Sequence, residues 1–149
     1  MMTIPDKLIA LSHFNTRSKW NEIDIELVEY LTIINQFTFI QSLITRAGND
    51  TSPCFIEFIT ALSAQDMIDY IISPMQKKFL HTFHIELRTY YQTHDIVYTV
   101  VFKRNHDEQI KELISILDMI HPIMNAKYHS VLINESEFEG RQLFNTTIY

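Results

Sequence analysis

The sequence has few of the residues that ligand-binding loops use most. It contains two glycines, Gly48 and Gly140, where average usage of about 7% would give roughly ten. Glycine-rich phosphate loops, dinucleotide-binding turns and nucleophile elbows need glycine where the backbone approaches a ligand closely. None of these motifs is present, so the sequence lacks the commonest nucleotide-binding and hydrolase signatures.

Cysteine is scarcer still, because Cys54 is the only one in the chain. A single cysteine excludes an intramolecular disulfide and paired-cysteine metal motifs, and it fits a reducing compartment. The opening MMTIPDKLIALSHFN has no basic segment ahead of a long apolar core, so it does not predict a secretory signal. The longest uncharged run, residues 30–45, falls short of the about twenty residues that a spanning helix needs. We therefore expect a protein that is neither secreted nor in a membrane, either cytoplasmic or incorporated in a viral particle.

Positive charge is also in the minority, with a net charge of −6 and 20% charged residues. This balance argues against a broad nucleic-acid-binding surface. Tyr90, Tyr91, Tyr98 and Phe102 are residue types that stack on bases, but the spacing of an RNA-binding sheet is absent. We expect no nucleic-acid partner.

Apolar periodicity predicts that residues 18–80 are mainly helical. Apolar residues recur there mostly at steps of three and four from Ile23 to Ile44, as on one face of a helix. Gly48 is expected to end this helical span, and Ser52-Pro53 to open a second helix through residue 62. Ser63 is expected to cap a third helix, which Pro74 ends or bends.

The remaining residues, 81–149, predict a hairpin, a helix and two further strands. Residues 83–91 alternate between apolar and polar, and residues 96–103 are rich in β-branched and aromatic types, which is typical of paired strands. We expect Leu87 opposite Val100 and Ile85 opposite Phe102.

The helix after the hairpin is expected to start at Asn105, with Glu108 completing a capping box. We expect it to stop at His121-Pro122 and strands to follow at residues 128–133 and 142–149. The sequence therefore predicts one α+β domain over residues 1–149, with a helical N-terminal half packed on an antiparallel sheet in β-β-α-β-β order.

Four histidines lie in or beside the predicted hairpin. The expected register places His81 opposite His106 and His84 at the same end, with Asp107 next to them, whereas His94 lies at the far tip. Imidazoles and a carboxylate can bind zinc, but residues three apart on a strand point to opposite faces. We therefore expect these side chains to be polar residues on the solvent-exposed surface, with no metal, cofactor or catalytic site, and keep His81, His84, His106 and Asp107 as weak metal candidates.

Other reactive groups also have ordinary interpretations. Cys54 would lie in a first helical turn, which favours a thiolate, but a free cysteine is most often buried. The acidic residues fall into two groups, each expected on a solvated surface: Glu22, Asp24, Glu26 and Glu29, and Glu135, Glu137 and Glu139.

These features favour a non-enzymatic structural subunit that assembles with other protein chains as a homo- or hetero-oligomer. The β-β-α-β-β order is similar to that of small phage tail-completion and tail-terminator domains, a similarity of element order without a shared motif. One alternative is a small metal-binding protein or hydrolase that uses the histidine cluster. Another is an acidic inhibitor or regulator that binds a host protein.

Overall fold

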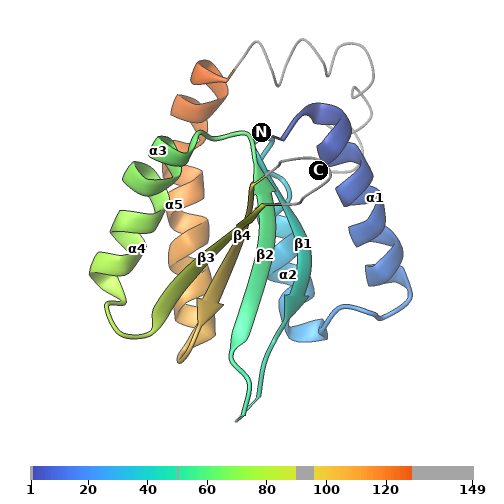
Figure 1. Ribbon diagram of the computed structural model, residues 1–149. Coiled ribbons are helices and arrows are strands. Elements are labelled where there is room, and N and C mark those ends of the chain that lie inside the picture. Colours follow the sequence, from blue (N-terminus) through green and yellow to red (C-terminus); the bar gives the residue numbers. More distant parts are fainter. Residues whose placement is uncertain (1, 50, 90–95, 129–149) are drawn as a thin grey trace.

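The computed structural model describes residues 2–49, 51–89 and 96–128. It has an α+β fold in which helices pack on a four-stranded antiparallel sheet (Figure 1). The elements are α1 (Ile4–Lys19), α2 (Ile25–Ile34), β1 (Ile40–Arg46), β2 (Cys54–Thr60), α3 (Ala64–Met67), the π-helical turn η1 (Ile68–Ile72), α4 (Ser73–Lys78), β3 (Phe83–Thr89), β4 (Ile96–Phe102) and α5 (His106–Lys127).

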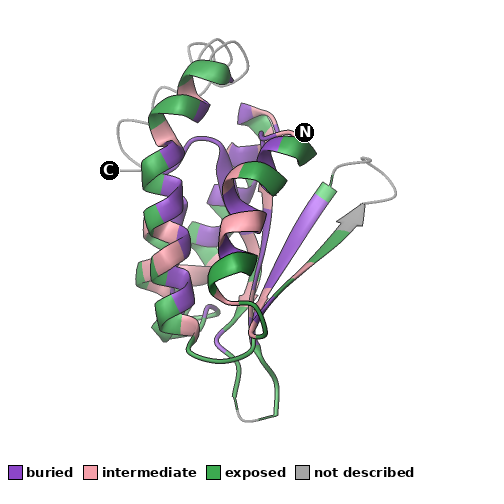
Figure 2. Cartoon of the chain, turned by 90° about the vertical axis from the view of Figure 1, so that its left-hand side faces the viewer, coloured by how far each residue is buried: buried purple, intermediate pink, exposed green. Residues whose placement is uncertain are grey.

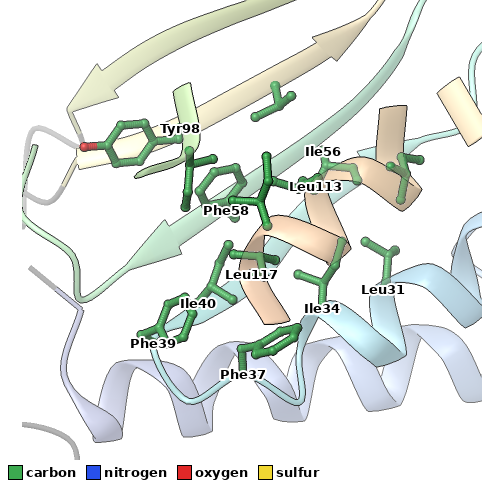
Figure 3. Packing of buried hydrophobic residues seen from close by; sticks show 14 of the residues in the cluster. Leu31, Ile34, Phe37, Phe39, Ile40, Ile56, Phe58, Tyr98, Leu113 and Leu117 are labelled. Carbon is green, nitrogen blue, oxygen red and sulfur yellow. The ribbon is translucent and has the colours of Figure 1, made fainter. Parts of the chain in front are cut away.

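The sheet consists of two hairpins joined side by side, in the order β1-β2-β4-β3. Every neighbouring pair is antiparallel. At the junction of β2 and β4 the rings of Phe58 and Tyr98 stack with centroids 5.6 Å apart. Leu113 and Leu117 of α5 point toward this region, where the core is continuous from sheet to helix (Figure 3).

The helices lie on one face of this sheet or at its edges. In Figure 1, α2 and α5 lie behind the strands, α1 flanks β1, and the α3–α4 segment flanks the opposite side. The helix-side face of the strands is apolar and includes Ile56, Phe58, Val100 and Phe102, all buried. Within the described residues, no helix is both long and apolar enough to cross a membrane.

The prediction that residues 18–80 are mainly helical is wrong for two stretches, β1 and β2. The strand β2 has the sequence CFIEFIT and is buried or half-buried at every position. A strand with apolar residues on both faces loses the period of two, so a short apolar run cannot be distinguished from a helix by periodicity. Ser52-Pro53 therefore leads into a strand, and Gly48 forms the turn between strands at a φ of 83°.

The hairpin of β3 and β4 is confirmed, but the predicted register is wrong by two residues. Ile85 lies opposite Val100, and Phe83 lies opposite Phe102. Within the described residues the last pair is Thr89 with Ile96. A shift of two keeps each side chain on its predicted face.

The helix α5 differs from the prediction at both ends. Asn105 precedes it with a φ of 49°, and its side chain makes no capping hydrogen bond, so the expected capping box does not form. The helix continues past His121-Pro122 to Lys127. Burial of Met124 and Tyr128 stabilises the longer helix. This burial offsets the loss of the backbone hydrogen bond that a proline removes.

Two smaller predictions have mixed outcomes. Ser63 does cap α3, since its hydroxyl accepts the backbone N–H of Asp66 at 3.2 Å. Pro74 lies in the first turn of α4, directly after η1. The strands predicted at 128–133 and 142–149 lie outside the described residues, except that Tyr128 is the C-cap of α5.

Candidate functional site

The candidate histidines do not form one cluster. His81 is exposed in the turn before β3, and His84 lies opposite Val101 with its Nε2 3.4 Å from a Glu86 carboxylate oxygen. His106 lies instead at the start of α5. Over the parts of the chain that the structure describes, no three His, Cys, Asp or Glu side chains are placed to hold a metal ion.

His106 links the first turns of two helices. Its Nε2 lies 3.7 Å from an Asp107 carboxylate oxygen and 3.8 Å from one of Glu26 in α2. About two thirds of each carboxylate side chain is exposed to solvent, so water screens these contacts. The two carboxylates complement the positive ends of the two helix dipoles.

Cys54 is the first residue of β2 and is buried, as the sequence suggested. Burial raises the pKa of its thiol to about 12, with smaller contributions from nearby carboxylates of Glu26, Asp107 and Asp24. A nucleophilic cysteine needs a lowered pKa and access to solvent. The geometry therefore favours a small core residue over a nucleophile.

The other residues that the sequence suggested for a site are exposed, buried in the core or outside the described residues. Tyr98 and Phe102, which were considered for base stacking, are 2% and 1% exposed. The first acidic group, at residues 22–29, is exposed, and one of its members, Asp24, accepts the backbone N–H of Ala47 at 2.6 Å. The second acidic group, Tyr90, Tyr91 and His94 lie outside the described residues.

The most unusual ionisable group is one that the sequence did not indicate, the fully buried Lys7 of α1. Its ammonium donates to the carbonyl of Ile40 at 2.6 Å, the side-chain carbonyl of Gln41 at 2.9 Å and the carbonyl of Asn35 at 3.1 Å. Burial lowers the pKa of Lys7 to about 7. Three acceptors match the three N–H groups of an ammonium, so Lys7 fastens α1 to the joint between α2 and β1.

A shallow hollow of about 670 Å³ lies on the sheet face that the described helices leave open. The strands supply Phe55 and Val101 as its apolar floor, and the loop between β1 and β2 forms one wall with Gly48 and Pro53. Ile44, which is 51% exposed, stands at its border.

Polar groups cross the same hollow in one row. Glu57 and Glu86 both lie opposite Thr99, one on each side. The hydroxyl of Thr99 is buried without a hydrogen-bond partner among the described residues, and Arg46 and Asp24 add charges at the rim. Mixed apolar and charged lining of a shallow surface is typical of a protein contact.

Comparison with protein-family models, with curated proteins and with solved structures finds no match for this chain. Function must therefore be argued from the geometry alone.

Proposed function

We propose that the chain is a non-enzymatic subunit that assembles with other protein chains through the sheet face that the described helices do not cover. The observation that carries the proposal is the hollow beside Ile44, Phe55 and Val101 on the face opposite the helices. Apolar side chains on an exposed, polar-rimmed surface are favourable to bury against a partner.

The alternative of a metal-binding protein or hydrolase gains no support from the described geometry, because His84 and His106 lie on different elements with different carboxylate neighbours. Membership of a phage or viral particle stays a prediction based on element order alone. The acidic regulator also stays a prediction, since the negative charge is spread over several elements.

Site-specific photocrosslinking in the native cells tests the proposal. A photoreactive phenylalanine derivative at position 55 should give a discrete product with a second protein that co-elutes at fixed stoichiometry. The same derivative at Met119, which is 68% exposed on α5, is the matched control and should give none.

A substitution in the hollow provides the second arm of the test. Val101→Asp should abolish co-elution while the circular dichroism of the chain remains unchanged. Equal crosslinking at positions 55 and 119, or co-elution that survives Val101→Asp, would contradict the proposal.

A further inference from the structure

The two edges of the sheet differ in how far they are covered. Along β1, α1 lies against the edge, and Arg17 donates to the carbonyl of Leu43 at 2.9 Å. No strand pairs with the outer side of β3 within the described chain. In Figure 2 the described part of the β3–β4 hairpin leans away from the helices.

One hydrogen bond fixes which backbone groups of β3 point outward. The N–H of Lys103 donates to the carbonyl of Thr82 at 2.8 Å. The backbone groups of Thr82 therefore point toward the strand that pairs with β3. Residues of an antiparallel strand alternate between facing the partner and facing away. The even-numbered residues of β3 therefore face β4, and Ile85 and Leu87 direct their N–H and C=O groups outward.

The backbone N–H and C=O groups that point outward from β3 form a row along its outer edge. The turn before the strand occupies the first of these groups, and the groups near Leu87 are accessible. The N–H of Phe83, which belongs to this row, donates to the carbonyl of Phe79 at 3.0 Å, so the preceding turn occupies that end. Leu87 is 55% exposed, whereas Ile85 is partly buried against the core. The accessible part of the edge thus centres on Leu87.

Charge and space select one register for a second β3 strand related by a two-fold axis. Centring the axis on Ile85 would drive the second strand into the turn at residues 79–82. Centring it on Glu86 would place two glutamates opposite each other, which is destabilising. With the axis at Leu87, each Glu86 faces position 88 of the other copy, where the sequence has an arginine.

From this geometry we propose that β3 pairs antiparallel with β3 of a second copy, on a two-fold axis at Leu87. The two four-stranded sheets then become one continuous sheet, and the two Leu87 side chains cover each other. The inference deepens the proposed assembly function by naming a partner, and it rests on that function only for its biological role.

The expected dimer is weak. Specific stable interfaces bury about 1,200–2,000 Å² in total, and a pairing confined to the end of one short strand lies at the low end of that scale. We therefore expect a Kd of about 10–100 µM, because such small contacts barely exceed the entropic cost of association.

Sedimentation velocity of the full chain from about 5 to 300 µM tests the inference, since this range brackets the expected Kd. The wild-type weight-average mass should rise toward twice that of the monomer. Leu87→Asp should remain monomeric throughout. Met119→Asp removes a comparably exposed apolar side chain on α5 and should dimerise like the wild type.

Two further variants test the backbone and the register. Leu87→Pro removes an outward N–H without touching the ladder to β4 and should weaken the dimer at least tenfold. Glu86→Arg should also prevent dimerisation by placing like charges opposite each other, and Glu86→Arg/Arg88→Glu should restore it. Circular dichroism of each variant establishes that the monomer is folded.

The outcomes are distinct. A wild type that stays monomeric, a dimer that survives Leu87→Asp, or a double variant that fails to restore pairing overturns the inference. None of these results affects crosslinking at position 55, so the second-copy interface can fail while the proposed assembly function stands.

Discussion

At the residue scale, Lys7 keeps a charged group out of water, and all three of its acceptors are uncharged. Such a group stabilises the fold only through its hydrogen bonds, because burial itself opposes the charge. Lys7→Met should lower the free energy of unfolding at pH 7 by about 2–4 kcal/mol, since three buried acceptors lose their donor.

Urea unfolding measures this change, and Lys78→Met is the matched control. Lys78 forms an exposed ion pair with Glu112 at 2.9 Å, and such pairs contribute about 0–1 kcal/mol. A Lys7→Met effect no larger than that of Lys78→Met would show that the three contacts do not hold α1 in place.

The same residue predicts a pH dependence of defined sign. The pKa of Lys7 is lowered from 10.5 to about 7, so between these values the folded chain binds fewer protons than the unfolded chain. The free energy of unfolding then rises with pH across this window. The difference between wild type and Lys7→Met should grow from pH 7 to pH 10 in urea titrations; a constant or shrinking difference would contradict the lowered pKa.

Asp66 predicts a second dependence of the free energy of unfolding on pH. Its carboxylate accepts from the ammonium of Lys127 and the hydroxyl of Tyr128, each at 2.6 Å. Lys127, and then Tyr128, lower the pKa of this carboxyl below its usual 3.8. The stability that it contributes is present above pH 3.8 and is lost as the pH falls through the lowered pKa.

Asp66→Asn should therefore destabilise the chain by about 1–2 kcal/mol at pH 7, because the hydrogen bond from the lysine loses its charge. Thermal unfolding across the acid range should show the variant and the wild type converging. Asp69→Asn alters a nearby exposed carboxylate that accepts from Gln65 and should have little effect at any pH. An Asp66→Asn loss that does not depend on pH would be inconsistent with the proposed ion pair.

At the element scale, the hairpin of β1 and β2 depends on the conformation of its turn. Gly48 has a φ of 83°, and a Cβ atom there would lie 2.5 Å from the backbone nitrogen of Cys54. Gly48→Ala should cost at least about 1–2 kcal/mol, because both the left-handed conformation and the backbone contact oppose a side chain.

Chemical denaturation checks this cost against Ser52→Ala, which alters an exposed residue in the same loop. Surface changes of that kind usually stay within about 0.5 kcal/mol. Equal stability of Gly48→Ala and the wild type would mean that the turn can relax at no cost.

Sequence patterns predicted elements well where one face of the element is exposed to solvent and the other is buried. The alternation in β3 and the apolar stripe of α5 were correctly interpreted because each presents both an exposed and a buried side. The strand β2 was missed because both of its faces carry apolar side chains, with Ile56 and Phe58 on one face and Phe55 on the other, so no alternation remains.

The candidate sites were less predictable than the elements. In the sequence Lys7 resembles any surface lysine. Its burial depends on three carbonyl oxygens that accept its hydrogen bonds, from Asn35, Ile40 and Gln41. Likewise, the hollow needs β1, β2 and β4 side by side, and two of those strands were expected to be helical. Contacts between distant segments leave no periodic signal in one sequence.

At the scale of the whole molecule, the described helices cover one face of the sheet and leave the other without a helix against it. Helices cover one face of the sheet, and α1 covers the edge formed by β1. The hollow lies on the other face. At the outer edge of β3, α4 and the turn after it adjoin the start of the strand, and no strand pairs with the edge among the described residues. Both proposed contacts use these two surfaces.

The central junction of β2 with β4 also has a kinetic consequence. Each hairpin joins strands close in the sequence, whereas the junction pairs Cys54 with Phe102 across the whole α3–α4 segment. Closing a long loop costs entropy before its contacts form, and such distant pairings slow folding. We therefore expect the two hairpins to form early and the stacking of Phe58 on Tyr98 to form late, when the β2–β4 junction closes.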